Sequence, residues 1–131
     1  MTRGRVLLVD DRTEFLKVLM ERMQSRGYEA VGVDSGAQAL EAFAGERAFD
    51  VVVLDMVMPE MDGLETLKRL RQMDPEVAVI VLTGYGTSGE VAQALALGAR
   101  DYLVKPADLD MLLERIDEAI AAKAPGGGAP A

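Results

Sequence analysis

The sequence contains no cysteine and no histidine among its 131 residues. Without cysteine, the chain has no disulfide, no thiolate metal site and no cysteine nucleophile. Without histidine, it lacks the commonest general base and the commonest ligand of transition metals. Any functional site must therefore be built from carboxylates, hydroxyls, lysine and the backbone.

Long hydrophobic runs are also missing, because charged residues interrupt every apolar segment. No segment reaches the roughly 20 apolar residues that a membrane-spanning helix needs. The apolar run Val6–Val9 near the N-terminus is too short for the core of a signal peptide. We therefore expect a cytoplasmic protein that does not enter a membrane.

The composition is that of an ordinary globular domain, since 50% of the residues are hydrophobic and 27% are charged. The length suits one domain, residues 1–123. Residues 124–131 contain only Gly, Pro and Ala and are interpreted as a flexible tail or linker. Asp and Glu number 22 against 14 Lys and Arg, which gives a formal net charge of −8. This charge repels phosphate backbones, so we expect no direct binding to nucleic acid, whereas divalent cations and basic partners are attracted.

Apolar segments alternate with helix-periodic segments along the whole chain. The apolar segments predict strands buried on both faces, at Arg5–Val9, Tyr28–Val33, Val51–Leu54, Val77–Leu82 and Tyr102–Val104. The periodic segments predict helices around Leu16–Met23, Gln38–Ala44, Leu64–Arg71, Glu90–Leu97 and Leu109–Ile120. Five β-α units in succession predict an α/β fold, with a five-stranded parallel sheet and helices on both of its faces.

Polar side chains follow four of these strands, at the edge where α/β proteins bind their ligands. Asp10 and Asp11 follow the first strand, Asp55 the third, Thr83 the fourth and Lys105 the fifth. Taken singly, each is also explained by a turn, a helix cap or a strand end. Together, three carboxylates need a cation between them, and an all-oxygen cluster suits Mg²⁺ or Mn²⁺.

The segments VLLVDD, VLDMVMPEMDGLE, VIVLTGYG and DYLVKP resemble, in this order and spacing, the receiver domain of two-component response regulators. The resemblance covers nearly the whole chain apart from its tail. It implies a flavodoxin-like (βα)5 fold with strand order 2-1-3-4-5. It also implies that the chain accepts a phosphoryl group from a histidine kinase or a histidine phosphotransfer protein. A surface formed by the fourth helix, fifth strand and fifth helix would then switch its contacts with an output domain or protein.

The resemblance assigns the phosphoacceptor and the metal ligands. Asp55 matches the phosphoacceptor, and Asp10 and Asp11 match the acidic pair that holds Mg²⁺. Asp55 itself and the backbone carbonyl of Val57 would complete the metal site. The domain would catalyse only its own phosphorylation and dephosphorylation, so it is not classed as an enzyme.

Four further residues receive roles from the same resemblance. Thr83 matches the hydroxyl that meets the phosphoryl group and moves during the switch, and Lys105 matches the lysine that pairs with that group. Lys105 and Pro106 would share a cis peptide bond. Tyr102 occupies the position of an aromatic residue that changes its packing when the domain switches.

Other interpretations remain open at this point. The run GYGTSG at residues 84–89 matches G-x-G-x-x-G and, taken alone, indicates dinucleotide binding. However, it lies in the fourth βα unit, and Asp10 and Asp11 would repel a pyrophosphate at the first. A haloacid-dehalogenase-like phosphatase would carry a second aspartate where Val57 stands. A third alternative is a receiver that binds proteins without being phosphorylated. A phosphorylation-dependent homodimer is compatible with the sequence.

Overall fold

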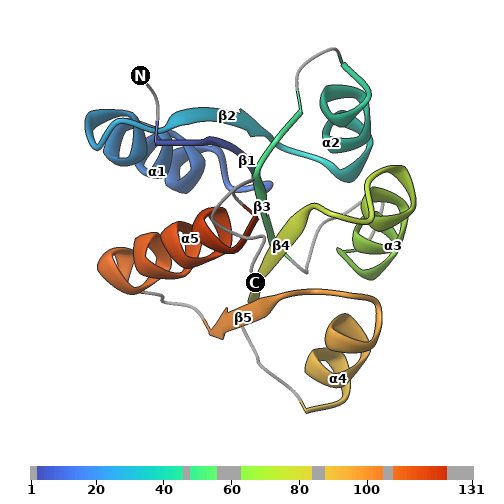
Figure 1. Cartoon of the computed structure of the whole chain (residues 1–131). Helices are drawn as coiled ribbons and strands as arrows, with labels where there is room; N and C mark the ends of the chain where they lie inside the picture. Colours follow the sequence, from blue (N-terminus) through green and yellow to red (C-terminus); the bar gives the residue numbers. More distant parts are fainter. Residues whose placement is uncertain (1–2, 46–47, 56–62, 84–87, 105–107, 124–131) are drawn as a thin grey trace.

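Five parallel strands form one sheet in the order β2-β1-β3-β4-β5, with helices on both of its faces (Figure 1). The computed structural model describes residues 3–45, 48–55, 63–83, 88–104 and 108–123. The strands are β1 (Arg5–Val9), β2 (Glu29–Val33), β3 (Val51–Asp55), β4 (Ala78–Thr83) and β5 (Asp101–Val104). The predicted α/β class, parallel sheet and strand order are confirmed.

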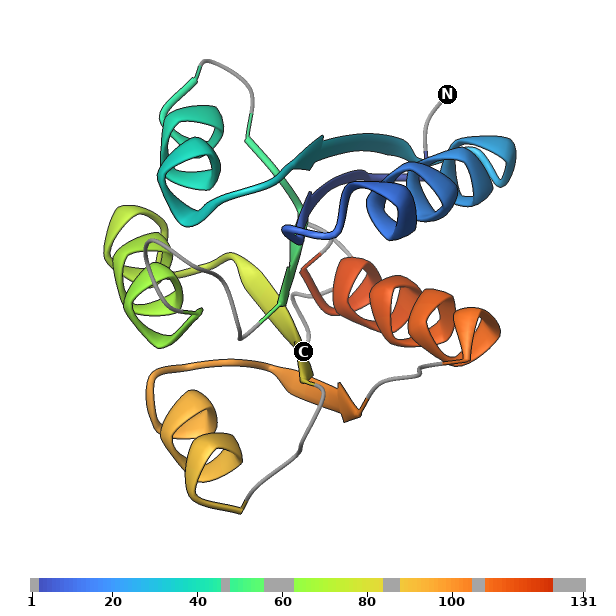
Figure 2. The ribbon, with the colours of Figure 1, turned by 180° about the vertical axis from the view of Figure 1, so that it is seen from behind.

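A helix follows each strand in the chain, which is how parallel strands are connected. The helices within the described ranges are α1 (Thr13–Ser25), α2 (Gly36–Phe43), α3 (Gly63–Met73), α4 (Ser88–Ala96) and α5 (Leu109–Lys123). Seen from behind, α1 and α5 lie side by side on one face of the sheet, opposite α2, α3 and α4 (Figure 2). Within the described part of the chain, no helix has the length and apolar character needed to cross a bilayer.

The sheet separates two hydrophobic layers, and the alternation of side chains along each strand supplies both. On one face, Val51 and Val53 of β3 pack with buried residues of α1 and α5. On the other face, Val52 and Leu54 pack with buried residues of α2, α3 and α4. Burial on both faces explains why the strands are continuous apolar runs rather than alternating patterns.

The predicted helix boundaries follow local capping chemistry. The Ser35 side chain accepts a hydrogen bond from the Gln38 backbone N–H at 3.1 Å, so it caps α2. Gly27 and Gly98 follow the ends of α1 and α4 and have φ angles of +96° and +103°. Glycine adopts this left-handed conformation without a Cβ penalty, so both positions stop their helices.

Several predicted strand boundaries are wrong by one residue, and strand pairing explains two of them. Asp55 pairs with Leu82 and Thr83 pairs with Val104, so both polar residues end strands instead of following them. Tyr28 is not in β2, because its N–H bonds to the Met23 carbonyl oxygen at the end of α1. A polar residue that is still paired with a neighbouring strand is therefore easily taken, from the sequence alone, to lie beyond the end of its strand.

Candidate functional site

Three carboxylates from two neighbouring strands meet at the carboxyl edge of the sheet. Asp10, Asp11 and Asp55 each place one carboxylate oxygen within 4.8 Å of the others. The strands β1 and β3 are adjacent, and Val9 pairs with Leu54. The residues that follow in register are therefore Asp10 and Asp55, so strand pairing itself brings the two acids level.

Burial makes this acidic cluster unusual. Asp10 is only 3% exposed and Asp55 4%, whereas Asp11 is exposed. Buried carboxylates lose hydration, and neighbouring negative charges repel each other, so a nearby cation stabilises such a group. The donor set consists only of carboxylate oxygens, which hard divalent cations such as Mg²⁺ prefer. The acidic pocket therefore has the chemistry to bind a metal ion.

Asp10 is oriented by its own neighbours. Its Oδ1 accepts a hydrogen bond of 2.9 Å from the Arg12 backbone N–H and lies 3.7 Å from the Arg12 Nε. Its own N–H donates to the carbonyl oxygen of Val33 at 3.1 Å, which extends the pairing of β1 with β2. The sequence analysis did not assign Arg12 to the site, because an arginine that follows two acidic residues is equally expected as an ordinary solvent-exposed side chain.

The remaining predicted site residues differ in what the structure describes. Thr83 is the last residue of β4, the strand beside β3, so its backbone lies at the same edge as the acidic cluster. Tyr102 is the second residue of β5 and is 39% exposed. Val57, Lys105 and Pro106, together with most of the GYGTSG run, lie outside the described residues.

The surface formed by α4, β5 and α5 contains an ion pair and several exposed apolar side chains. Arg115 of α5 donates a hydrogen bond to the Asp101 carboxylate at the start of β5. This contact raises the pKa of Arg115 above its usual value, so the guanidinium stays charged. Leu95 of α4, Tyr102 and Met111 of α5 all present exposed side chains. The pair fixes α5 to the edge strand beside these exposed residues.

An apolar groove lies between α1 and α5. It has a volume of about 190 Å³ and is lined by Phe15, Val18, Leu19, Arg22, Leu109 and Leu112. Phe15 is 37% exposed and Val18 52%. The sequence analysis found only the buried stripe of α1 and missed this outer pair, although two large apolar residues outside the stripe were a visible signal.

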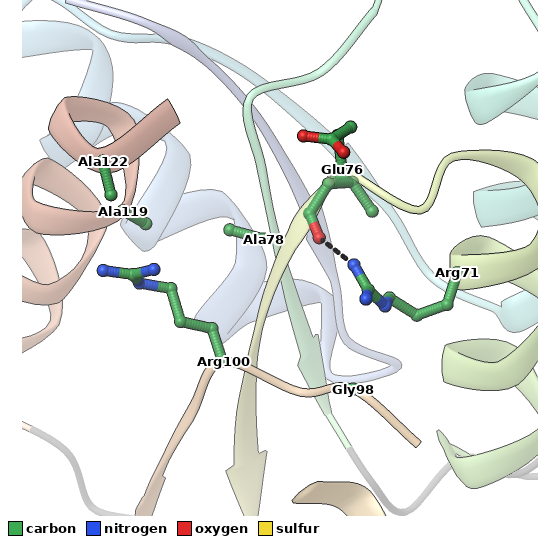
Figure 3. Close-up of a pocket in the computed structure, with 8 residues that line it drawn as sticks. Arg71, Glu76, Ala78, Gly98, Arg100, Ala119 and Ala122 are labelled. Carbon is green, nitrogen blue, oxygen red and sulfur yellow. Dashed lines mark hydrogen bonds between the residues drawn. The ribbon is translucent and has the colours of Figure 1, made fainter. Parts of the chain in front are cut away.

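A larger cavity of about 320 Å³ lies at the opposite edge of the sheet (Figure 3). Its walls include Ala78 at the start of β4, Arg100 just before β5, and Arg71 at the end of α3. These residues belong to the amino ends of the strands, so this cavity is separate from the acidic cluster.

Comparison with known proteins identifies the family. The sequence model of the response regulator receiver domain matches residues 6–117. The chain belongs to the response regulator receiver domain family. A solved receiver domain protein (CheY-like) from Methanospirillum hungatei JF-1 is 29% identical, with a TM-score of 0.88 over 92% of this chain and 95% of that one. A receiver domain protein from Clostridium thermocellum is 31% identical, with a TM-score of 0.87 over 92% and 96% of the two chains.

Curated relatives of this receiver domain are longer proteins. The transcriptional regulatory protein ZraR of Escherichia coli O157:H7 is 39% identical over 116 residues, which are 88% of this chain and 26% of ZraR. The transcriptional regulatory protein GlrR of Escherichia coli K12 is 38% identical over 122 residues, 93% of this chain and 27% of GlrR. The chain thus spans about a quarter of the length of these relatives.

Proposed function

We propose that this receiver domain accepts a phosphoryl group onto Asp55 in a Mg²⁺-dependent reaction. The donor is a phosphohistidine on a histidine kinase or a histidine phosphotransfer protein, since this chain has no histidine of its own. The observation that carries the proposal is the convergence of Asp10, Asp11 and Asp55 at one edge of the sheet. Family membership supports two-component signalling as the setting.

In this mechanism, a carboxylate oxygen of Asp55 attacks the phosphorus atom of the donor. A P–O bond forms as the P–N bond breaks, and the donor imidazole leaves with the bonding electron pair and takes up a proton. Aspartate carboxylates are ordinarily ionised at neutral pH, so the nucleophile needs no general base. The absence of histidine is therefore compatible with this chemistry.

The other site residues align the reaction and balance its charge. Asp10, Asp11, Asp55 and the carbonyl of Val57 would hold the metal ion. A bound Mg²⁺ supplies neutralisation of the negative charge on the transferring group. Lys105 would pair with the new phosphoryl oxygens.

The switch rests on Thr83 and Tyr102. Once Asp55 is phosphorylated, the Thr83 hydroxyl would bond to the phosphoryl group and draw the end of β4 toward it. Tyr102 lies on the neighbouring strand and is partly exposed, so its packing can respond. The surface of α4, β5 and α5 would then favour a different contact with an output domain or protein. Tyr102→Ala is expected to remove the dependence of output affinity on phosphorylation while leaving phosphorylation intact.

The groove between α1 and α5 is suited to the phosphodonor. Exposed Phe15 and Val18 offer an apolar surface one to two turns after Asp11 along the chain. The Arg12 guanidinium lies 5.2 Å from the centre of the Phe15 ring, and Arg22 lines the same groove. Two cations beside an apolar groove, in a domain of net charge −8, favour a donor helix with an apolar ridge and acidic flanks.

A phosphorylation assay with two donors tests these roles. With Mg²⁺ and acetyl phosphate, intact mass spectrometry should show one added phosphoryl group on the wild-type domain and none on Asp55→Asn. Failure of the wild-type domain to accept the group would favour the alternative of a phosphorylation-independent interaction module.

The same assay separates donor docking from chemistry. Val18→Ser is expected to slow transfer from a phosphorylated histidine protein by about tenfold, which corresponds to about 1.4 kcal/mol of lost contact. Its rate with acetyl phosphate should be unchanged, because that small donor does not need the groove. Leu95→Ser on α4 is a matched control, since Leu95 is similarly exposed but lies on another helix.

A further inference from the structure

Arg12 lies at the rim of the acidic cluster, on backbone that is held by hydrogen bonds on both sides. Its N–H donates to the Asp10 Oδ1 at 2.9 Å, and its carbonyl oxygen accepts a hydrogen bond from the Leu16 N–H at 3.0 Å. The Arg12 side chain therefore starts from a defined place beside Asp10, so its charge is delivered to the cluster by the fold itself.

The Arg12 guanidinium lies beside a buried carboxylate while it stays largely in water. Its Nε is 3.7 Å from the Asp10 Oδ1, a separation that suits an ion pair but is too long for a hydrogen bond. The Arg12 side chain is 57% exposed, whereas that of Asp10 is 5% exposed. The positive charge therefore offsets part of the repulsion within the cluster and gives up little of its own hydration.

The placement of Arg12 is not explained by the needs of α1. Arg12 occupies the N-cap position of this helix, where Ser, Thr, Asp and Asn are preferred, and its side chain forms no capping hydrogen bond within the described residues. The N-terminus of a helix also carries a partial positive charge, which disfavours a cation there. Contacts of the guanidinium with Asp10 and with the Phe15 ring, whose centre lies 5.2 Å away, offset this unfavourable placement.

A divalent ion held by the acidic cluster would meet the charge of Arg12 beside its own site. Asp10, Asp11 and Asp55 each bring one carboxylate oxygen within 4.8 Å of the others. Arg12 would act on metal binding in two ways, because it stabilises the carboxylates without a metal ion and repels a second cation that approaches them. Both effects weaken the affinity for the metal ion, so they add.

We propose that Arg12 is a built-in counter-cation of the acidic cluster, which competes with Mg²⁺ and raises the Mg²⁺ concentration that phosphorylation requires. This inference rests on the proposed function for the identity of the metal site and adds the residue that sets its affinity. For a charge this exposed, we expect an effect of about three- to tenfold on the Kd for Mg²⁺ at 0.1 M salt. The effect should shrink in 1 M salt, because the Debye length falls from about 10 Å to about 3 Å.

Isothermal titration calorimetry of Mg²⁺ binding tests the competition without a phosphoryl donor. Arg12→Gln removes the charge and keeps a polar side chain, so Mg²⁺ should bind about fivefold more tightly than to the wild-type domain at 0.1 M NaCl. Arg12→Lys keeps the charge, and its Kd should stay within about twofold of the wild-type value. In 1 M NaCl, the Kd values of Arg12→Gln and the wild-type domain should differ by less than about twofold.

Arg26→Gln is the matched control, because it removes the same unit of charge from the other end of α1. Arg26 also forms an ion pair with an aspartate, since its Nη2 lies 3.2 Å from the Asp110 Oδ1. The 13 residues of α1 separate it from Arg12 by about 20 Å, beyond the Debye length at 0.1 M salt. Its Kd for Mg²⁺ should therefore match the wild-type value. Equal tightening in Arg12→Lys or Arg26→Gln would overturn the proposal.

A double-mutant cycle in a chelator tests the counter-cation separately from any metal ion. Asp10→Asn removes the charge of Asp10 but keeps an oxygen that can accept the Arg12 N–H. Arg12→Gln should lower Tm by about 2 °C more in the wild-type background than in the Asp10→Asn background. Both backgrounds contain the same helix terminus, so its effect on Arg12 cancels. Equal changes in the two backgrounds would show that Arg12 does not neutralise Asp10, and the proposal would be wrong.

The calorimetry also separates this inference from the proposed function. Absence of Mg²⁺ binding to the wild-type domain would contradict the proposed function and, with it, the competition. Mg²⁺ binding with the same Kd in the wild-type domain and in Arg12→Gln would contradict the competition alone.

Discussion

The acidic cluster predicts that neutralising Asp55 stabilises the metal-free domain. Asp10 and Asp55 are both buried, and their nearest carboxylate oxygens lie within 4.8 Å. Two unit charges at that distance repel by about 3.5 kcal/mol at an effective dielectric constant of about 20. Exposed Asp11 adds about 0.9 kcal/mol, because water screens it more strongly. Asp55 also has an interaction of its own with the rest of the protein, so we expect only part of this repulsion to be recovered as stability. We therefore expect Asp55→Asn to raise the free energy of unfolding of the metal-free domain by about 1–3 kcal/mol. Each kcal/mol corresponds to an increase of roughly 4 °C in Tm.

Magnesium is expected to reverse the relative stabilities of the two proteins, so that the wild-type domain becomes more stable than Asp55→Asn. A ligand that binds only the folded state stabilises it by about 2.7 kcal/mol when its free concentration is 100 times Kd. Wild-type receiver domain should show this gain, and Asp55→Asn should show a much smaller one because it has lost a carboxylate from the cluster. Thermal unfolding of the two proteins should be measured first in a chelator and then across a Mg²⁺ titration. The plots of Tm against Mg²⁺ concentration for the two proteins should therefore cross.

Two controls make the crossing specific. Sodium chloride at matched ionic strength should not reproduce the effect of Mg²⁺. Glu21→Gln removes an exposed negative charge from α1, away from the cluster, and should change neither curve by more than about 0.5 kcal/mol. If Asp55→Asn is less stable than the wild-type domain in chelator and gains equally from Mg²⁺, the account of charge repulsion in this cluster is wrong.

Three other perturbations test the surrounding fold. Burial and a hydrogen bond to Asp117 raise the pKa of Tyr28 to about 12 from 10. The unfolded chain therefore loses this proton first, and stability should fall between pH 10 and 12. Tyr28→Phe should reduce this loss of unfolding free energy, measured by urea unfolding at each pH. If the loss between pH 10 and 12 is unchanged in the variant, other groups cause it. Leu67→Ala in α3 should cost about 2–5 kcal/mol of unfolding free energy, because Leu67 is fully buried; a loss below about 1 kcal/mol would show that the layer collapses around it. Gly32→Ala in β2 should cost about 1–3 kcal/mol, because the new Cβ would lie 2.4 Å from the Met20 Sδ. Met20→Ala should recover part of that loss, and no recovery would place the strain elsewhere.

The fold was predictable because its local and long-range requirements agree. Strands buried on both faces need continuous apolar runs, and β3, with the sequence VVVLD, shows this requirement directly. The predicted strand ends were wrong by one residue at Asp55 and Thr83, since ladder pairing continues through polar residues that the sequence presents as breaks. The helix predicted around Glu90–Leu97 does end before Gly98, but the contact of Gly98 with Arg71 depends on where a long side chain of another helix points.

The convergence of Asp10, Asp11 and Asp55 was predictable for a different reason. Parallel topology places the ends of all strands at one edge, so residues far apart in the chain meet there without any special local pattern. The Arg12 contact with Asp10 and the groove at Phe15 were not predictable in this way. The first depends on the conformation of the Arg12 side chain and the second on how α1 and α5 pack together, and hydrophobic periodicity specifies neither.

The register of β1 against β3 is the step that connects the core to the acidic cluster. Both faces of β3 are apolar, so a slip by one residue would still bury apolar side chains, and the hydrophobic pattern alone does not exclude it. Polar contacts at the other end of the pair do exclude it. The Asp50 carboxylate accepts a 2.8 Å hydrogen bond from the Arg5 N–H, and the Asp50 N–H donates to the Arg5 carbonyl oxygen at 2.8 Å. A slip would break both bonds and move Asp10 out of step with Asp55. An aspartate at the amino edge thus helps to align the aspartates at the carboxyl edge.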